Sequence, residues 1–272
     1  MPDIPLLLIV ELLLLGSVVG FLAGLLGVGG GMMLVPVMTW LLTQQGVDGG
    51  TAVKLAIATS MATILFTSSS SLRAHHRLGF VRWDLVKRLA PGIVAGGLLA
   101  GAGAFALLKG QVLALCFAAF IGWMALRLLR GKPPKPGRQL PGTLGISAVG
   151  TGIGFLSGLV GAGGAFLSVP FMTRCNVPPR EAVGTSSALG FVVATAATTG
   201  YLISGWNETH TLAGILGYLY LPGLFIISAA SMTFAPLGAR TAQRMEERTL
   251  TRVFAVLLLC LSASMLAQAW RA

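Results

Sequence analysis

Two copies of one glycine-rich motif decide the fold that we expect. Gly20–Pro36 reads GFLAGLLGVGGGMMLVP, and Gly154–Pro170 reads GFLSGLVGAGGAFLSVP. Ten of the 17 positions are identical, at an offset of 134 residues. A second match follows in the same order, because Ala56–Ser60 resembles Ala182–Ser186. We therefore expect a duplication of one structural unit.

The composition around these motifs indicates a membrane protein. Of the 272 residues, 55% are hydrophobic and 10% are charged, whereas soluble domains have about 25% charged residues. This mixture excludes a soluble enzyme, a disulfide-stapled secreted domain and a disordered chain. Long apolar segments, each sufficient to span a bilayer as a helix, cover residues 4–26, 55–72, 89–108, 111–129, 141–160, 182–203, 211–237 and 250–270.

Two further apolar segments, 32–43 and 165–173, are too short to cross a membrane. Each follows a glycine cluster that ends a longer apolar segment. We therefore expect half-helices, each forming the second arm of a broken or re-entrant hairpin.

The charges predict how the chain is oriented. The net charge is +11, from 19 Lys and Arg against 8 Asp and Glu. We attribute this excess to topology, not to nucleic-acid binding, because 16 of the 19 basic residues fall in loops or helix ends that share one predicted side. Segment 4–43 then begins and ends outside the cell, whereas segment 141–173 begins and ends inside it, so the two hairpins have opposite orientations. The predicted fold is an all-α polytopic membrane protein of two inverted-topology repeats, each a broken or re-entrant hairpin followed by three transmembrane helices. The predicted parts are residues 1–130, a cytoplasmic linker 131–140, and residues 141–272.

The glycine clusters predict a binding site. Duplicated halves of opposite orientation are typical of secondary transporters, whose substrates bind near the midplane at the interface of the repeats. A broken helix exposes unpaired N–H groups at a helix N-terminus, and these groups bind anions. The alternative is close helix packing on small residues, which suits Gly16, Gly20, Gly24, Gly150, Gly154 and Gly158.

Two matching Thr-Ser pairs lie about one turn into the helices that follow the predicted half-helices, and their hydroxyls can donate hydrogen bonds to an anion. The alternative for these residues is a bond to a carbonyl of their own helix, or contact between helices. The candidate substrate-binding residues are Gly29, Gly30, Gly31, Thr59, Ser60, Gly163, Gly164, Ala165, Thr185 and Ser186. Lys54 and Arg180 are candidate entrance charges at opposite faces, although ordinary interfacial side chains of this type also extend toward the headgroups.

The duplicated GFxxGLxGxGG motif with its trailing proline, followed by a Thr-Ser pair, resembles the sulfite exporter TauE/SafE family of membrane permeases. The resemblance covers essentially the whole chain. It implies transport of a small sulfur-containing anion, such as sulfite, sulfoacetate or a related organosulfonate, across the bacterial cytoplasmic membrane. One departure is Ala165, which stands where the first copy has Gly31.

The sequence thus predicts a secondary permease that works by alternating access and is not an enzyme. Its expected partners are the anion and the lipid bilayer, with no cofactor, no metal and no nucleic acid; a homo-oligomer is compatible with the sequence. Both termini are expected on the periplasmic side of the inner membrane. Three alternatives stay open. They are a channel-like anion pathway, a membrane thiol redox relay through Cys116, Cys175 and Cys260, and an intramembrane hydrolase.

Overall fold

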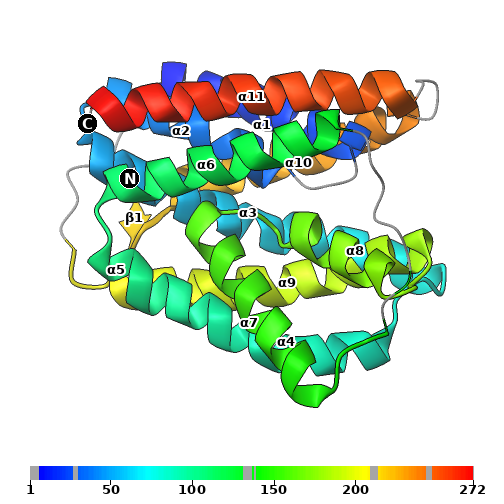
Figure 1. Ribbon diagram of the computed structural model, residues 1–272. Helices are drawn as coiled ribbons and strands as arrows, with labels where there is room; N and C mark the ends of the chain where they lie inside the picture. Colours follow the sequence, from blue (N-terminus) through cyan, green and yellow to red (C-terminus); the bar gives the residue numbers. More distant parts are fainter. Residues whose placement is uncertain are drawn as a thin grey trace.

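The computed structural model describes residues 6–26, 30–130, 137, 139–208, 214–242 and 247–271, and they are almost entirely helical (Figure 1). The helices of the first half are α1 (Leu6–Leu26), α2 (Gly31–Gln44), α3 (Gly49–Arg77), α4 (Trp83–Leu98), the π-helix η1 (Leu99–Ala104), α5 (Phe105–Leu107) and α6 (Gly110–Leu129). Those of the second half are α7 (Thr143–Val160), α8 (Ala165–Arg174), α9 (Pro179–Ser204), α10 (Leu221–Ala242) and α11 (Glu247–Arg271). Strands β1 (Ile215–Leu216) and β2 (Leu219–Tyr220) form an antiparallel hairpin before α10.

Eight helical segments of the described chain are long and apolar enough to cross a membrane. They are α1, α3, the continuous run of α4, η1 and α5, and helices α6, α7, α9, α10 and α11. Helices α2 and α8 have 14 and 10 residues, too few for a full crossing. Their bounds lie within a residue of the predicted half-helices 32–43 and 165–173. The prediction of an all-α polytopic membrane protein is confirmed.

One predicted segment is wrong at its start. In the apolar segment 211–237, the described residues 214–220 are not helical, because they form the β1–β2 hairpin and α10 starts at Leu221. Gly214 and Gly217 have φ angles of +82° and +59°, which turn the chain back on itself. Hydropathy alone does not distinguish such an apolar hairpin from the first turns of a helix.

Helices α3 and α9 pack against each other at the centre and are the most buried of the eight spanning segments (Figure 1). The short helix α2 packs on α3, and the short helix α8 packs on α9. Three further pairs surround this core: α1 with α10, α4 with α7, and α6 with α11. Each of these pairs joins one helix from before the linker to one from after it.

Small residues allow two of these pairs to approach closely. A methyl group placed on Gly20 of α1 would lie 2.4 Å from the Cα atom of Ser231 in α10. One placed on Gly154 of α7 would lie 2.3 Å from the carbonyl oxygen of Ile93 in α4. The packing interpretation is therefore confirmed for the glycines that precede each cluster, which are Gly16, Gly20, Gly24, Gly150, Gly154 and Gly158.

Some predicted features lie outside the described residues. They are Gly29 of the candidate site, residues 131–136 and 138 of the predicted linker, and the basic residue Arg244. The division of the chain into two repeats stays a prediction.

Candidate functional site

The second helix break is described in full. Helix α7 ends at Val160, and α8 begins at Ala165. Gly161 and Gly164 have φ angles of +68° and +73°, in the left-handed region that disfavours residues with a Cβ atom. The two glycines thus end one helix and start the next with a sharp change of direction. The predicted interruption at Gly163, Gly164 and Ala165 is present.

The first glycine cluster is described only at its end. Helix α1 is described to Leu26, residues 27–29 lie outside the described residues, and α2 begins at Gly31 with Gly30 as its N-cap. Gly30 has an ordinary helical φ of −78°, so backbone conformation does not require glycine there. Close packing requires glycine at this position, because a methyl group on Gly30 would lie 2.2 Å from Cγ1 of Val19.

The two breaks meet at the side chain of Ser60 in α3. The Ser60 hydroxyl donates a hydrogen bond to the carbonyl oxygen of Gly31, at 2.8 Å, and lies 3.4 Å from the carbonyl oxygen of Gly161. A methyl group on Gly31 would lie 2.8 Å from that same Gly161 oxygen. Residues about 130 positions apart in sequence are therefore in direct contact.

The matching hydroxyl in α9 behaves differently. Ser186 donates to the carbonyl oxygen of Val183 in its own helix, at 2.8 Å, and among the described residues its hydroxyl forms no hydrogen bond with either break. Helix α9 instead approaches the second break through Gly190, where a methyl group would lie 3.0 Å from the carbonyl oxygen of Gly163. The structure brings together Gly31, Ser60 and the Gly161–Gly164 loop, and it leaves Ser186 out of this contact.

The two threonines of the candidate site each accept a hydrogen bond from the residue directly before a helix. The Thr59 hydroxyl oxygen accepts a hydrogen bond from the backbone N–H of Tyr220, directly before α10, at 3.0 Å. The Thr185 hydroxyl oxygen accepts one from the backbone N–H of Arg82, directly before α4, also at 3.0 Å. Both threonines are fully buried. Each hydroxyl therefore links a central helix to the beginning of a helix from the other half.

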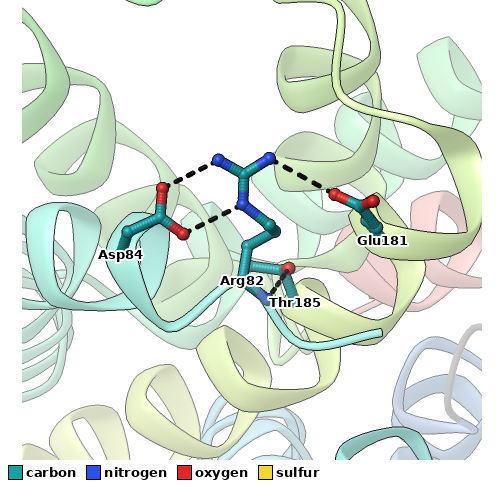
Figure 2. A network of polar contacts seen from close by, with 4 residues as sticks. All are labelled: Arg82, Asp84, Glu181 and Thr185. Atoms are coloured by element: carbon teal, nitrogen blue, oxygen red, sulfur yellow. Dashed lines mark hydrogen bonds and ion pairs between the residues drawn. The ribbon is translucent and has the colours of Figure 1, made fainter. Parts of the chain in front are cut away.

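A network of charged side chains surrounds the hydrogen bond between Arg82 and Thr185 (Figure 2). The Arg82 guanidinium donates to both carboxylate oxygens of Asp84, at 3.0 and 2.9 Å, and to Glu181 at 3.3 Å. These hydrogen bonds raise the pKa of Arg82 further above its ordinary value. Because Asp84 is on α4 and Glu181 on α9, the network joins the beginnings of both helices. Arg82 was not among the predicted site residues.

Lys54, a predicted entrance charge, is half-buried among aromatic rings. Its ammonium group lies 5.2 Å from the ring centre of Tyr218 and 5.9 Å from that of Phe105. The Tyr218 hydroxyl donates to Glu208 at 3.3 Å. Burial, with Glu208 adding to it, raises the pKa of Tyr218 to about 12. Arg180, the other predicted entrance charge, is exposed at the start of α9.

Two buried hydroxyls beside the second break were missed from sequence. Ser157 on α7 and Ser168 on α8 are 1% and 0% exposed, and neither has a hydrogen-bond partner within the described chain. Most Ser and Thr side chains in these helices donate to a carbonyl three or four residues earlier. Ser157 and Ser168 are exceptions, as are Thr198 on α9 and Ser228 on α10, which lie outside this break. The available clue was the repeat itself, since Ser157 and Ser168 stand where the first motif has Ala23 and Leu34.

No metal centre is found in the part of the chain that the structure describes, where no three His, Cys, Asp or Glu residues are grouped suitably for an ion. The arrangement instead offers backbone amides and hydroxyls close to two helix N-termini. Such groups bind anions through hydrogen bonds.

Comparison with known proteins agrees with this geometry. The family described as sulfite exporter TauE/SafE matches residues 12–265. The chain belongs to this family. A probable membrane transporter protein of Haemophilus influenzae is 32% identical, over 93% of this chain and 96% of the relative. The family assignment makes the chain a multi-pass membrane transporter, as the sequence predicts.

More distant relatives carry similar descriptions. The probable membrane transporter protein YunE of Bacillus subtilis is 26% identical over 94% of this chain and 97% of its own length. A probable membrane transporter protein of Methanocaldococcus jannaschii is 24% identical over 90% of both chains. No solved structure matches this chain.

Proposed function

We propose that the protein is a secondary permease that moves a small sulfur-containing anion, such as sulfite, sulfoacetate or a related organosulfonate, across the bacterial inner membrane. The observation that carries this proposal is the junction of the two helix breaks at Ser60. There, Gly31 and the Gly161–Gly164 loop bring the N-termini of α2 and α8 into one buried region. Backbone amides at such positions suit an anion and do not require a buried cation.

The proposed mechanism is alternating access between two inverted repeats. Support comes from the helix pairs, since α1 runs parallel to α10 and α7 runs parallel to α4, each packed on matching glycines. Gly20 and Gly154 are 134 positions apart in the sequence, and the residues that they contact, Ser231 and Ile93, are 138 positions apart. The same offset of 138 relates Tyr220 to Arg82 in the two threonine links. Related halves of this kind can exchange conformations and open the site to each side in turn.

The threonine links and their neighbours suit the two gates of such a cycle. At one end, Thr185 and Glu181 of α9 hold Arg82 at the start of α4. At the other end, Thr59 of α3 holds Tyr220 before α10. Opening either gate requires breaking one hydrogen bond from a backbone N–H to a threonine hydroxyl and, at the Arg82 end, one partly exposed ion pair. Both are small costs, since each contributes about 1 kcal/mol.

The orientation follows from the positive-inside rule. Arg73, Arg77, Arg82, Lys87 and Arg88 cluster around the α3–α4 turn, so this end is placed in the cytoplasm. Both termini then face the periplasm. An inside-negative membrane potential drives an anion outward, by about 2.3 kcal/mol per charge for each 100 mV, so export needs no further coupling.

The test is counterflow in liposomes that contain the purified protein. Vesicles are loaded in turn with unlabelled sulfite, sulfate, thiosulfate, sulfoacetate or taurine, and uptake of the same labelled compound is followed. A carrier gives saturable, transient accumulation of at least one sulfur anion. Unsaturable conductance supports the channel alternative, and no protein-dependent flux of any of the five compounds contradicts the proposal.

A further inference from the structure

The N-terminus of α8 differs from that of α2 in the side chains around it. Ser157 and Ser168 belong to the second half alone, because the equivalent residues of the first half, Ala23 and Leu34, are apolar. Both serines are buried with no hydrogen-bond partner among the described residues. An unpaired buried hydroxyl is costly to a fold, and buried polar groups almost always have partners. The two serine hydroxyls are therefore available to donate hydrogen bonds to a ligand at this helix end.

These hydroxyls lie at the place where a ligand would meet the helix end. A methyl group on Gly164, the N-cap of α8, would lie 3.4 Å from the Ser157 hydroxyl oxygen. Ser168 is on the first turn of α8, where its own N–H donates to the carbonyl oxygen of Gly164. Because Cα–Cβ bonds in a helix lean toward its N-terminus, the Ser168 side chain extends back over that turn.

Backbone donors complete the arrangement. The N–H groups of Leu167 and Ser168 are bonded to the Gly164 carbonyl oxygen. For the N–H groups of Ala165 and Phe166, no acceptor is found in the described part of the chain. Two amides and two hydroxyls, four donors in all, are thus unpaired around one helix end.

The segment that forms this helix end carries no charged side chain. Gly154–Pro170 contains no Lys, Arg, Asp or Glu. A site of neutral donors must compensate the full cost of removing an anion from water, and this cost rises with the square of the charge. Four neutral donors therefore suit a singly charged anion with three oxygens on one atom better than a doubly charged one.

We propose that Ser157, Ser168 and the first amides of α8 form an oxyanion subsite for a group with one negative charge and three oxygens on one sulfur atom. The sulfonate group of sulfoacetate or methanesulfonate and the hydrogensulfite ion are such groups, and the subsite binds them in preference to the doubly charged sulfate. This inference rests on the proposed permease function, and it places the anion on one side of the pseudo-symmetric junction. The first break then supports the packing of the second through Gly31 and Ser60 and does not hold an equivalent anion.

The test measures binding of methanesulfonate and of sulfate to the purified full-length protein by isothermal titration calorimetry. The wild type is compared with Ser157→Ala, Ser168→Ala and the double variant. The matched control is Ser264→Ala, whose hydroxyl donates to Leu261 within its own helix. Sulfite counterflow in liposomes is recorded for every variant.

We expect wild type and Ser264→Ala to bind methanesulfonate at least tenfold more tightly than sulfate. Each site variant should weaken methanesulfonate binding by roughly ten- to a hundredfold, as for a hydrogen bond to a charged group. The unfolding midpoint without ligand should stay equal or rise, because an unpaired buried hydroxyl has been removed. This separates a lost ligand contact from a damaged fold.

Two results overturn the inference and leave the permease proposal intact. In the first, the double variant binds methanesulfonate as tightly as the wild type does. In the second, the wild type binds sulfate as tightly as methanesulfonate. In both cases the wild type shows normal sulfite counterflow. Absence of both binding and counterflow in the wild type overturns the inference together with the proposed function.

Discussion

Substitution of Gly31 by alanine tests the contact between the two helix breaks. The added methyl group would lie 2.8 Å from the carbonyl oxygen of Gly161, 2.8 Å from Cδ1 of Ile64 and 3.1 Å from the Ser60 hydroxyl oxygen. The Ile64 methyl is the end of a side chain and can rotate away. The Gly161 oxygen belongs to a backbone whose φ of +68° leaves little freedom, so the two breaks must move apart by a few tenths of an ångström.

The expected cost follows from similar overpacked sites, where an extra methyl group destabilises a protein by about 1–3 kcal/mol. Alanine recovers part of this, up to about 1 kcal/mol, because it limits the unfolded chain more than glycine does. We therefore expect Gly31→Ala to lower the free energy of unfolding by about 1–2 kcal/mol. Because the displaced groups belong to the proposed site, sulfite counterflow should fall much more than the amount of folded protein.

The matched control is Gly152→Ala on α7, where an added methyl group meets nothing within 4 Å. It should leave the unfolding midpoint unchanged or raise it, since alanine is favoured over glycine in a helix by about 1 kcal/mol. Both variants are purified in the same detergent, melted by intrinsic fluorescence, and reconstituted for counterflow. Equal midpoints and equal fluxes for Gly31→Ala and Gly152→Ala would refute the contact between the breaks.

Three further predictions concern the ends of the proposed pathway. Thr59→Val and Thr185→Val should each destabilise the protein by about 1–3 kcal/mol in thermal melts, because a buried or part-buried N–H loses its acceptor. Anion affinity should change little, and Thr→Ser should restore stability, whereas an affinity loss without destabilisation would favour direct ligand contact. Arg82→Gln should cost only about 0–1 kcal/mol of stability yet change the rate of counterflow, and an unaltered rate would remove its network from the gate. The unfolding midpoint should decline as the pH rises from about 10 to about 12, because the folded state keeps Tyr218 protonated after the unfolded state has ionised; Tyr218→Phe should show a smaller decline, and an identical decline would contradict the assigned environment.

The interruptions were predictable from sequence because glycine clusters and apolar length are local properties. Gly161 and Gly164 occupy left-handed conformations that glycine adopts at least cost. The length of the apolar segments likewise indicated that 32–43 and 165–173 could not cross the membrane alone. Both features depend on the chain near each residue, and both repeat motifs carry them.

The use of each hydroxyl was not predictable, because it depends on which backbone groups arrive from distant helices. Thr59 and Ser60 are adjacent in sequence, yet Thr59 holds the start of α10 while Ser60 contacts both breaks. Ser186 matches Ser60 in the repeat but bonds within its own helix. The ion pair between Arg82 and Glu181 links residues 99 positions apart, and no local pattern indicates such a contact.

The central claim is that an anion binds where the two interrupted helices meet. A cryo-electron microscopy structure with saturating methanesulfonate, compared with one without it, tests this most directly. We expect new density within hydrogen-bonding distance of the Ala165 amide and the Ser157 hydroxyl, with the Ser60 contact to Gly31 retained. Density at the exposed basic residues alone, or two identical structures under conditions where the protein transports the anion, would contradict it.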